Sequence, residues 1–146
     1  LIKKINPNCA FIFTISPVRH IKDGFVENQR SKAHLITAIH NIINYQLSIV
    51  NYFPSYEIMM DELRDYRFYA DDMLHPSQMA INYIWIRFLE NYISEENHST
   101  MEDVCAIQKA LAHRSFNPNS DAHQKFLSNL KDKISRLKEQ FPSIQF

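Results

Sequence analysis

An aspartate and a histidine stand three residues apart where a polar segment of the chain leads into a long amphipathic stretch. Asp72 and His75 lie in the run Asp71-Asp72-Met73-Leu74-His75-Pro76-Ser77. A carboxylate can accept the proton on one imidazole nitrogen, which fixes the tautomer and leaves the other nitrogen free to deprotonate a hydroxyl. The spacing therefore predicts that the Asp72 carboxylate and the His75 imidazole act as a hydrogen-bonded acid–base pair. The simpler alternative is an aspartate that caps a helix beside a surface histidine.

The sequence does not supply an obvious nucleophile for this pair. It contains no Gly-x-Ser-x-Gly or Gly-Asp-Ser element, and its only glycine, Gly24, has no serine within two positions. Ser16 ends an apolar run, but Pro17 follows it and no glycine-flanked turn exposes it in the manner of a nucleophilic serine. Its hydroxyl is expected to satisfy loop backbone instead. The hydroxyl that His75 would activate is therefore expected to come from elsewhere.

Two apolar segments are candidates for strands. Residues 9–15 (CAFIFTI) are apolar on both faces, as in a strand buried inside a parallel sheet. Residues 52–60 (YFPSYEIMM) have aromatic and β-branched character, but Pro54 limits them to a short or edge strand. A strand buried on both faces needs two neighbours. We therefore expect the chain to be part of a larger α/β domain whose earlier strands lie outside it.

Helical spacing of apolar residues covers most of the remaining chain. Residues 28–50 predict a helix with one buried stripe, and a second helix is predicted to begin at Pro76 and to end near residue 93. Serine and threonine at 99 and 100, each followed three residues later by an acid, have the spacing of capping boxes. Residues 121–140 predict a last helix with a narrow apolar seam for a helix partner.

These elements predict an α/β fold with few strands and a helix-rich C-terminal half. We divide it into residues 1–95, which hold both strands and the acid–base pair, and residues 96–146, a helical extension packed on them.

Composition and charge give no support for nucleic acid or a membrane as a partner. The chain has 146 residues, with 16 Lys plus Arg and 16 Asp plus Glu, so no net field would draw it to nucleic acid or to an anionic membrane. No apolar stretch approaches the roughly 20 residues that span a bilayer. Cys9 and Cys105 have no spacing suited to zinc or to a disulfide framework, which favours a reducing compartment and a cytoplasmic location.

Polar residues follow the first predicted strand. Arg19 and His20 stand just past its C-terminal end, where open α/β sheets bind ligands. They are expected either to orient a substrate or to form a hydrogen-bonded loop, and the sequence leaves both readings open. A zinc or manganese site built from Asp72, His75 and His20 is disfavoured, because the chain has no compact ligand motif of the His-Glu-x-x-His kind. No metal or other cofactor is expected.

The order of these features resembles the C-terminal half of SGNH-type (GDSL-like) hydrolases, whose last block carries Asp-x-x-His followed by proline and a terminal helix. Longer runs extend the likeness. The segments FTISPVRHIKDGFVENQRSKAHLI, YFPSYEIMMDELRDYRFYADDMLHPS and AHRSFNPNS are similar to the GSCFA family, a branch of that fold found largely in bacteria. Together they cover most of residues 6–126.

The resemblance implies a flavodoxin-like, three-layer hydrolase in which the serine of a Gly-Ser-Cys-Phe-Ala motif attacks the carbonyl of a small-molecule or carbohydrate ester. His75 would be the general base and Asp72 its orienter, with Ser16, Arg19 and His20 in supporting or substrate-binding places. The motif itself is absent from this sequence, as are the segments that would supply the oxyanion-hole donors, usually a glycine and an asparagine. The chain alone is therefore expected to be inactive.

A second hypothesis belongs to a different class of protein. The apolar strand and the leucine seam could serve a binding or self-association module, with Asp72 and His75 only capping a helix. Exposed strand edges invite pairing between chains, so this hypothesis predicts a homodimer.

Overall fold

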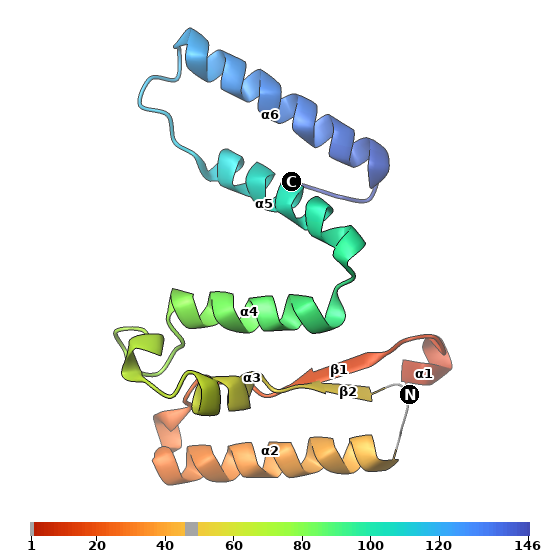
Figure 1. Ribbon diagram of the computed structural model, residues 1–146, viewed down its shortest axis with the longest axis vertical. Helices are drawn as coiled ribbons and strands as arrows, with labels where there is room; N and C mark the ends of the chain where they lie inside the picture. Colours follow the sequence, from red (N-terminus) through yellow and green to blue (C-terminus); the bar gives the residue numbers. More distant parts are fainter. Residues whose placement is uncertain (1, 46–49) are drawn as a thin grey trace. The chain divides into compact units, whose positions relative to one another are not determined.

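The computed structural model describes residues 2–45 and 50–146, and the chain divides into two units, Leu1–Tyr92 and Ile93–Phe146. In the first unit a short parallel sheet lies between two helices (Figure 1). Strand β1 (Phe11–Thr14) pairs with β2 (Val50–Phe53), in a register that runs from Phe11 opposite Val50 to Thr14 opposite Phe53.

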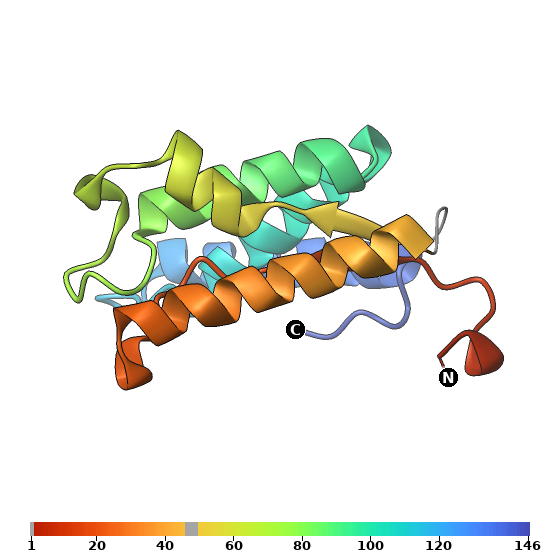
Figure 2. The same ribbon diagram turned by 90° about the horizontal axis from the view of Figure 1, so that it is seen from below.

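Helices cover both faces of this sheet. Parallel neighbours need a crossover connection, and helix α2 (Phe25–Tyr45) lies within it. Figures 1 and 2 both place α2 on one face of the strands and α4 (Gln78–Tyr92) on the other. The predicted α/β class, with few strands and a helix-rich C-terminal half, is confirmed.

Strand β1 is paired along one edge only within the described residues. Its apolar sequence suits burial on both faces, yet the side chains alternate between half-buried and exposed, and Ile12 is 43% exposed. The strand therefore presents unpaired backbone groups and apolar side chains together.

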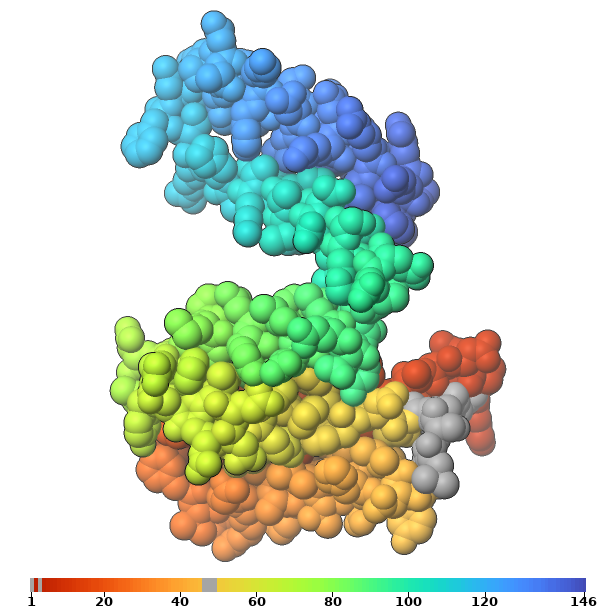
Figure 3. All heavy atoms as spheres, viewed as in Figure 1, coloured from red at the N-terminus to blue at the C-terminus, as the bar shows by residue number. Residues whose placement is uncertain are grey.

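The core of the first unit lies between β2 and α4. The buried residues are Phe53, Ile58, Met59, Leu63 and Ala80, and aromatic residues of α4 pack around them. The ring of Phe53 meets that of Phe88 edge to face, with 5.2 Å between ring centroids. In the space-filling view the side chains of residues 50–65 meet those of α4 (Figure 3).

The second predicted strand is only half right. It ends at Phe53, and the chain then turns into helix α3 (Ser55–Glu57), which continues as a π-helical turn, Ile58–Glu62. Pro54 is the physical reason, because it has no N–H to extend the ladder, while its carbonyl accepts from the N–H of Ile58. The helix predicted over 28–50 likewise ends at Tyr45 in the structure. Val50 belongs to β2, and residues 46–49 lie outside the described residues.

Shorter helices complete the first unit. Their bounds are α1 Ile2–Ile5 and the 3₁₀ turns Ile21–Asp23 and Tyr66–Phe68. Among the helices that the structure describes, none has both the length and the apolar character needed to cross a membrane.

The second unit contains a pair of helices, α5 (His98–Ala112) and α6 (Asp121–Gln140). The bounds predicted for the last helix are confirmed, and its apolar seam packs against α5 through Ile107, Leu130 and Leu137. Its N-terminus is capped by Ser120, whose side chain accepts from the N–H of His123 at 3.2 Å.

The predicted capping boxes of α5 are wrong. A 3₁₀ turn, Glu95–Asn97, leads straight into the helix at His98, so positions 99 and 100 already lie inside it. Asn97 at the cap position has helical backbone angles and makes no side-chain cap bond.

Candidate functional site

The candidate base lies in a loop that folds back on itself just before α4. Ala70 donates its N–H to the carbonyl of His75 at 2.8 Å, and Met73 donates its own to the carbonyl of Ala70 at 2.9 Å. Tyr69 and Pro76 form an isolated antiparallel bridge at the neck of the loop. Met73 has φ 58°, a left-handed conformation that costs a non-glycine residue about 1 kcal/mol or more. The loop is thus tightly turned and closed by backbone bonds.

Asp72 organises this loop with both of its carboxylate oxygens. Oδ1 accepts from the backbone N–H of Leu74 at 2.9 Å and from that of His75 at 3.0 Å. Oδ2 lies 2.6 Å from Nδ1 of the His75 ring. The predicted pairing is therefore present. Asp72 does not cap a helix, as the alternative held, but accepts from two backbone N–H groups of its own loop, before α4 begins at Gln78.

These bonds determine which nitrogen of His75 carries the proton. The backbone N–H groups of His75 and Leu74, followed by the imidazole, lower the pKa of Asp72 to about 2. Asp72 is therefore ionised at neutral pH and can only accept, so Nδ1 of a neutral His75 must be the donor and Nε2 holds the lone pair. The imidazole side chain is 60% exposed, and no group among the described residues hydrogen-bonds to Nε2.

Helix α4 begins later than the sequence predicts. Its first residue is Gln78, and Pro76 lies in the bridge with Tyr69 instead of in the first helical turn. Ser77 precedes the helix, and its hydroxyl accepts from the N–H of Ala80 at 3.4 Å. His75 accordingly belongs to the loop and not to the helix N-terminus.

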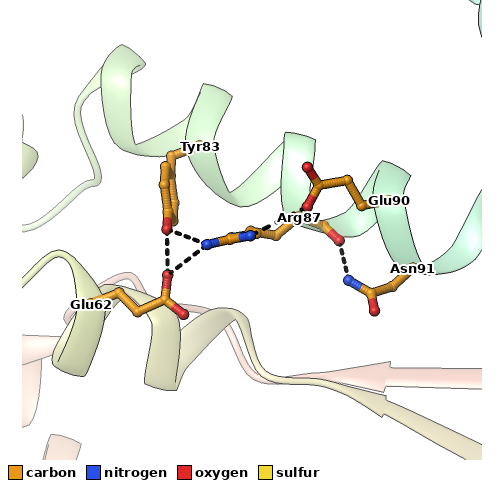
Figure 4. Close-up of polar contacts among 5 residues, drawn as sticks. All are labelled: Glu62, Tyr83, Arg87, Glu90 and Asn91. Atoms are coloured by element: carbon orange, nitrogen blue, oxygen red, sulfur yellow. Dashed lines mark hydrogen bonds and ion pairs between the residues drawn. The ribbon is translucent and has the colours of Figure 1, made fainter.

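A polar network fixes α4 to the turn that precedes the loop (Figure 4). Tyr83 donates its hydroxyl hydrogen to Glu62 at 2.5 Å, and Arg87 donates to the Tyr83 oxygen at 2.9 Å. Arg87 also bonds to Glu90, and Asn91 donates to the Arg87 carbonyl. The network therefore joins the π-helical turn that precedes the loop to the helix that follows it.

The structure places the three supporting candidates differently. The Ser16 hydroxyl accepts from the N–H of Val18 at 3.2 Å, in a local turn. The backbone N–H of His20 donates to the Asn28 side chain at 2.9 Å. Arg19 contacts the loop that carries Asp72 and His75. Within the described residues, neither Ser16 nor His20 hydrogen-bonds to that loop.

Arg19 holds the loop with its backbone and its side chain. Its N–H donates to the Leu74 carbonyl at 3.1 Å, and its Nη1 donates to the Met73 carbonyl at 3.2 Å. The guanidinium also lies over the Tyr69 ring, 4.1 Å from the centroid. The loop after β1 is thereby joined to the loop that carries Asp72 and His75.

An apolar groove of about 430 Å³ has Pro76, the residue after His75, in its lining. It is lined by residues of the sheet, of α4 and of the two loops: Ile12, Thr14, Pro17, Phe53, Ser55, Pro76, Ile81, Ile84, Trp85 and Phe88. The hydroxyls of Thr14 and Ser55 bond to each other at 2.7 Å and leave the walls apolar. The sequence reading missed this groove, although the wide apolar face of α4 was a signal for it.

The described residues offer no cluster for a metal ion. Nowhere in residues 2–45 and 50–146 do three or more His, Cys, Asp or Glu side chains gather in a way that could hold one. Asp72 and His75 thus form a two-residue pair.

Comparison with known proteins places the chain in a family. A model described as "GSCFA family" matches residues 1–88, which is more than half of the sequence. The chain belongs to the GSCFA family. A second model, described as "GSCFA domain protein, C-terminal domain", matches residues 104–146. No curated protein and no solved structure matches the chain. The predicted family is therefore confirmed, and all five candidate site residues of this GSCFA chain fall within residues 1–88.

Proposed function

We propose that this chain contributes the general base and its orienting carboxylate to a serine ester hydrolase or acyltransferase of the SGNH class. The observation that carries the proposal is the 2.6 Å contact of His75 Nδ1 with an ionised Asp72, which leaves an exposed Nε2 with a free lone pair. A neutral imidazole held in this tautomer is the form that removes a proton from a hydroxyl.

The reaction would proceed in two acyl-transfer steps. Nε2 of His75 takes the proton of a serine hydroxyl as the oxygen bonds to the ester carbonyl carbon. The resulting imidazolium, stabilised by Asp72, returns that proton to the departing alcohol as the ester C–O bond breaks. Water or a second alcohol then receives the acyl group by the same route. The reaction is hydrolysis if the acceptor is water and acyl transfer if it is an alcohol.

The nucleophile and the oxyanion donors are assigned to a segment outside this sequence. Ser16 is an unsuitable substitute, because its hydroxyl is bonded within its own turn. Since one oxyanion donor is worth about 10²–10³ in rate, the isolated chain would be inactive on esters.

We further propose a small-molecule or carbohydrate ester as the substrate and the cytoplasm as the location. Cys9 and Cys105 are both free thiols in the structure, which suits a reducing compartment. Neither nucleic acid nor a membrane is expected as a partner, given the balanced charge.

The proposal is tested with a polypeptide that carries both this chain and a segment with the Gly-Ser-Cys-Phe-Ala motif. It should hydrolyse members of a panel of acyl esters, and a serine-trapping phosphonate should stop the reaction by labelling the motif serine. If no ester is turned over and the phosphonate labels nothing, the assignment to this class of hydrolase is wrong.

A second candidate function is self-association, which the exposed apolar surface of the first unit favours. Strand β1 has an unpaired edge within the described residues, and the groove beside it includes Trp85, which is 48% exposed. A second copy of the chain would bury both features. Sedimentation should then show a dimer, and a well-folded monomer at all concentrations would contradict this alternative.

A further inference from the structure

Lys32 is a buried cation that the proposed chemistry does not use. It lies on α2 and is only 3% exposed, which is unusual for a lysine, since an ammonium group loses its hydration on burial. Its Nζ donates to the backbone carbonyl of Ser16 at 2.5 Å, and the Tyr56 ring centroid lies 5.7 Å away. Burial lowers the pKa of the Lys32 ammonium from its ordinary value.

The carbonyl that Lys32 binds belongs to a loop with little freedom. Ser16 follows the end of β1, and its side chain closes a turn by accepting from the Val18 N–H. Pro17 fixes its own φ near −65° and restricts the residue before it. Holding the Ser16 carbonyl therefore sets the direction in which the chain reaches Arg19.

From Arg19 the contacts continue to the candidate base. The Arg19 N–H donates to the Leu74 carbonyl, and the Leu74 N–H donates to Oδ1 of Asp72. Oδ2 of Asp72 then holds the His75 ring. Each link is a hydrogen bond between 2.6 and 3.1 Å.

We propose that Lys32 is a positioning residue for the Asp72 and His75 pair, and that it acts through the loop of residues 16–19. Its buried ammonium donates to the Ser16 carbonyl, and Arg19 of the same loop donates its N–H to the carbonyl of Leu74, whose own N–H is bound by Asp72. The catalytic importance of Lys32 rests on the proposed function, whereas the anchoring of the loop does not. Lys32 itself touches no reacting atom.

The test is amide hydrogen exchange on the whole 146-residue chain with Lys32→Met. Methionine fills a similar volume and removes the charge, so the core need not hold an unpaired ion. We expect the exchange of the Arg19, Leu74 and His75 amides to rise about tenfold, because the loop opens more often. The thermal midpoint and the exchange of amides inside α4, such as that of Phe88, should stay close to those of the unaltered chain.

Two further variants make the result decisive. Lys109→Met, at an exposed position of α5, carries the same change of chemistry and should leave the loop amides unchanged. Lys32→Gln serves if Lys32→Met does not fold, because the glutamine amide is polar but one atom too short to reach the Ser16 carbonyl, and the same rise is expected.

A uniform rise across core and loop amides would show a general stabilising role, and unchanged loop amides would show no coupling, so either result overturns the proposal. The exchange data report on the loop whether or not the protein turns over esters. A positive exchange result beside a failed ester assay would therefore retain the anchoring role and remove only the hydrolase assignment.

Discussion

Replacing Asp72 by asparagine should reverse the tautomer of His75 without dismantling the loop. The carbonyl oxygen of the new side chain can take the place of Oδ1 and go on accepting from the N–H groups of Leu74 and His75, at 2.9 and 3.0 Å. The amide nitrogen then stands where Oδ2 was, 2.6 Å from Nδ1. An amide nitrogen can only donate, so Nδ1 becomes the acceptor and the ring proton moves to Nε2.

The expected loss of activity follows from the loss of the lone pair on Nε2. Once protonated, it cannot take a proton from a hydroxyl, and ester hydrolysis by the serine-bearing polypeptide should fall about 10²–10⁴-fold, the usual contribution of a general base. The tautomer itself is measured in this chain from the ¹⁵N shifts of the His75 ring near pH 8. Asp71→Asn, at the exposed neighbouring position, is the matched control and should leave both shifts unchanged. If Nε2 stays unprotonated in Asp72→Asn, or if Asp71→Asn changes the tautomer as well, then Asp72 does not set the tautomer of His75.

Three further predictions concern stability. The folded-state pKa of Asp72 is lowered to about 2 from about 3.9 in an unfolded chain. The stability that Asp72 contributes is therefore complete above about pH 4 and is lost as the pH falls toward 2. Acid unfolding should show this loss in the unaltered chain and not in Asp72→Asn. Met59→Ala should lower the free energy of unfolding of the first unit by about 2–5 kcal/mol in urea titrations, because Met59 is fully buried, while exposed Met79→Ala should change it by less than about 0.5 kcal/mol. Ile107→Ala should destabilise the α5 and α6 pair by a similar amount to Met59→Ala, and equal losses from Ile107→Ala and exposed Leu111→Ala would contradict the packing described.

The sequence predicted a helix or strand correctly where a local pattern alone determines its bounds. The bounds of α6 were predicted from its regular apolar spacing and are found in the structure, where Ser120 caps the first turn. The structure of the segment after Pro54 was harder to predict. YEIMM contains strand-forming residues, but its apolar and polar residues do not alternate as in a strand. Its helical form depends on burying Ile58 and Met59 together against α4, which is a tertiary effect that overrides local preference.

In the candidate site, too, the local contacts could be predicted from the sequence and the long-range contacts could not. Asp72 and His75 are three residues apart, so their contact is a property of a single loop and could be predicted from spacing. The Arg19 contact joins a segment that follows β1 to a loop that follows its partner β2, 54 residues later, whereas the Lys32 contact joins α2 to the turn 16 residues before it. Nothing in the local sequence fixes that pairing, so the sequence could place Arg19 near a ligand-binding edge but could not show which carbonyls it would hold.

Arg19 also illustrates how a predicted role is refined by geometry. The sequence left open whether it orients substrate or stabilises a loop. Its two hydrogen bonds to the carbonyls of Met73 and Leu74, with Tyr69 under its guanidinium, support the loop role and leave substrate contact as a prediction.

Whether His75 is the general base is tested by measuring ester hydrolysis by a polypeptide that carries this chain together with the serine-bearing segment, before and after His75→Ala. We expect kcat to fall about 10²–10⁴-fold and the phosphonate to label the motif serine correspondingly more slowly, because that serine loses its base. His34→Ala, at an exposed position of α2, should change neither. Hydrolysis that continues at its full rate without the His75 imidazole would contradict the account.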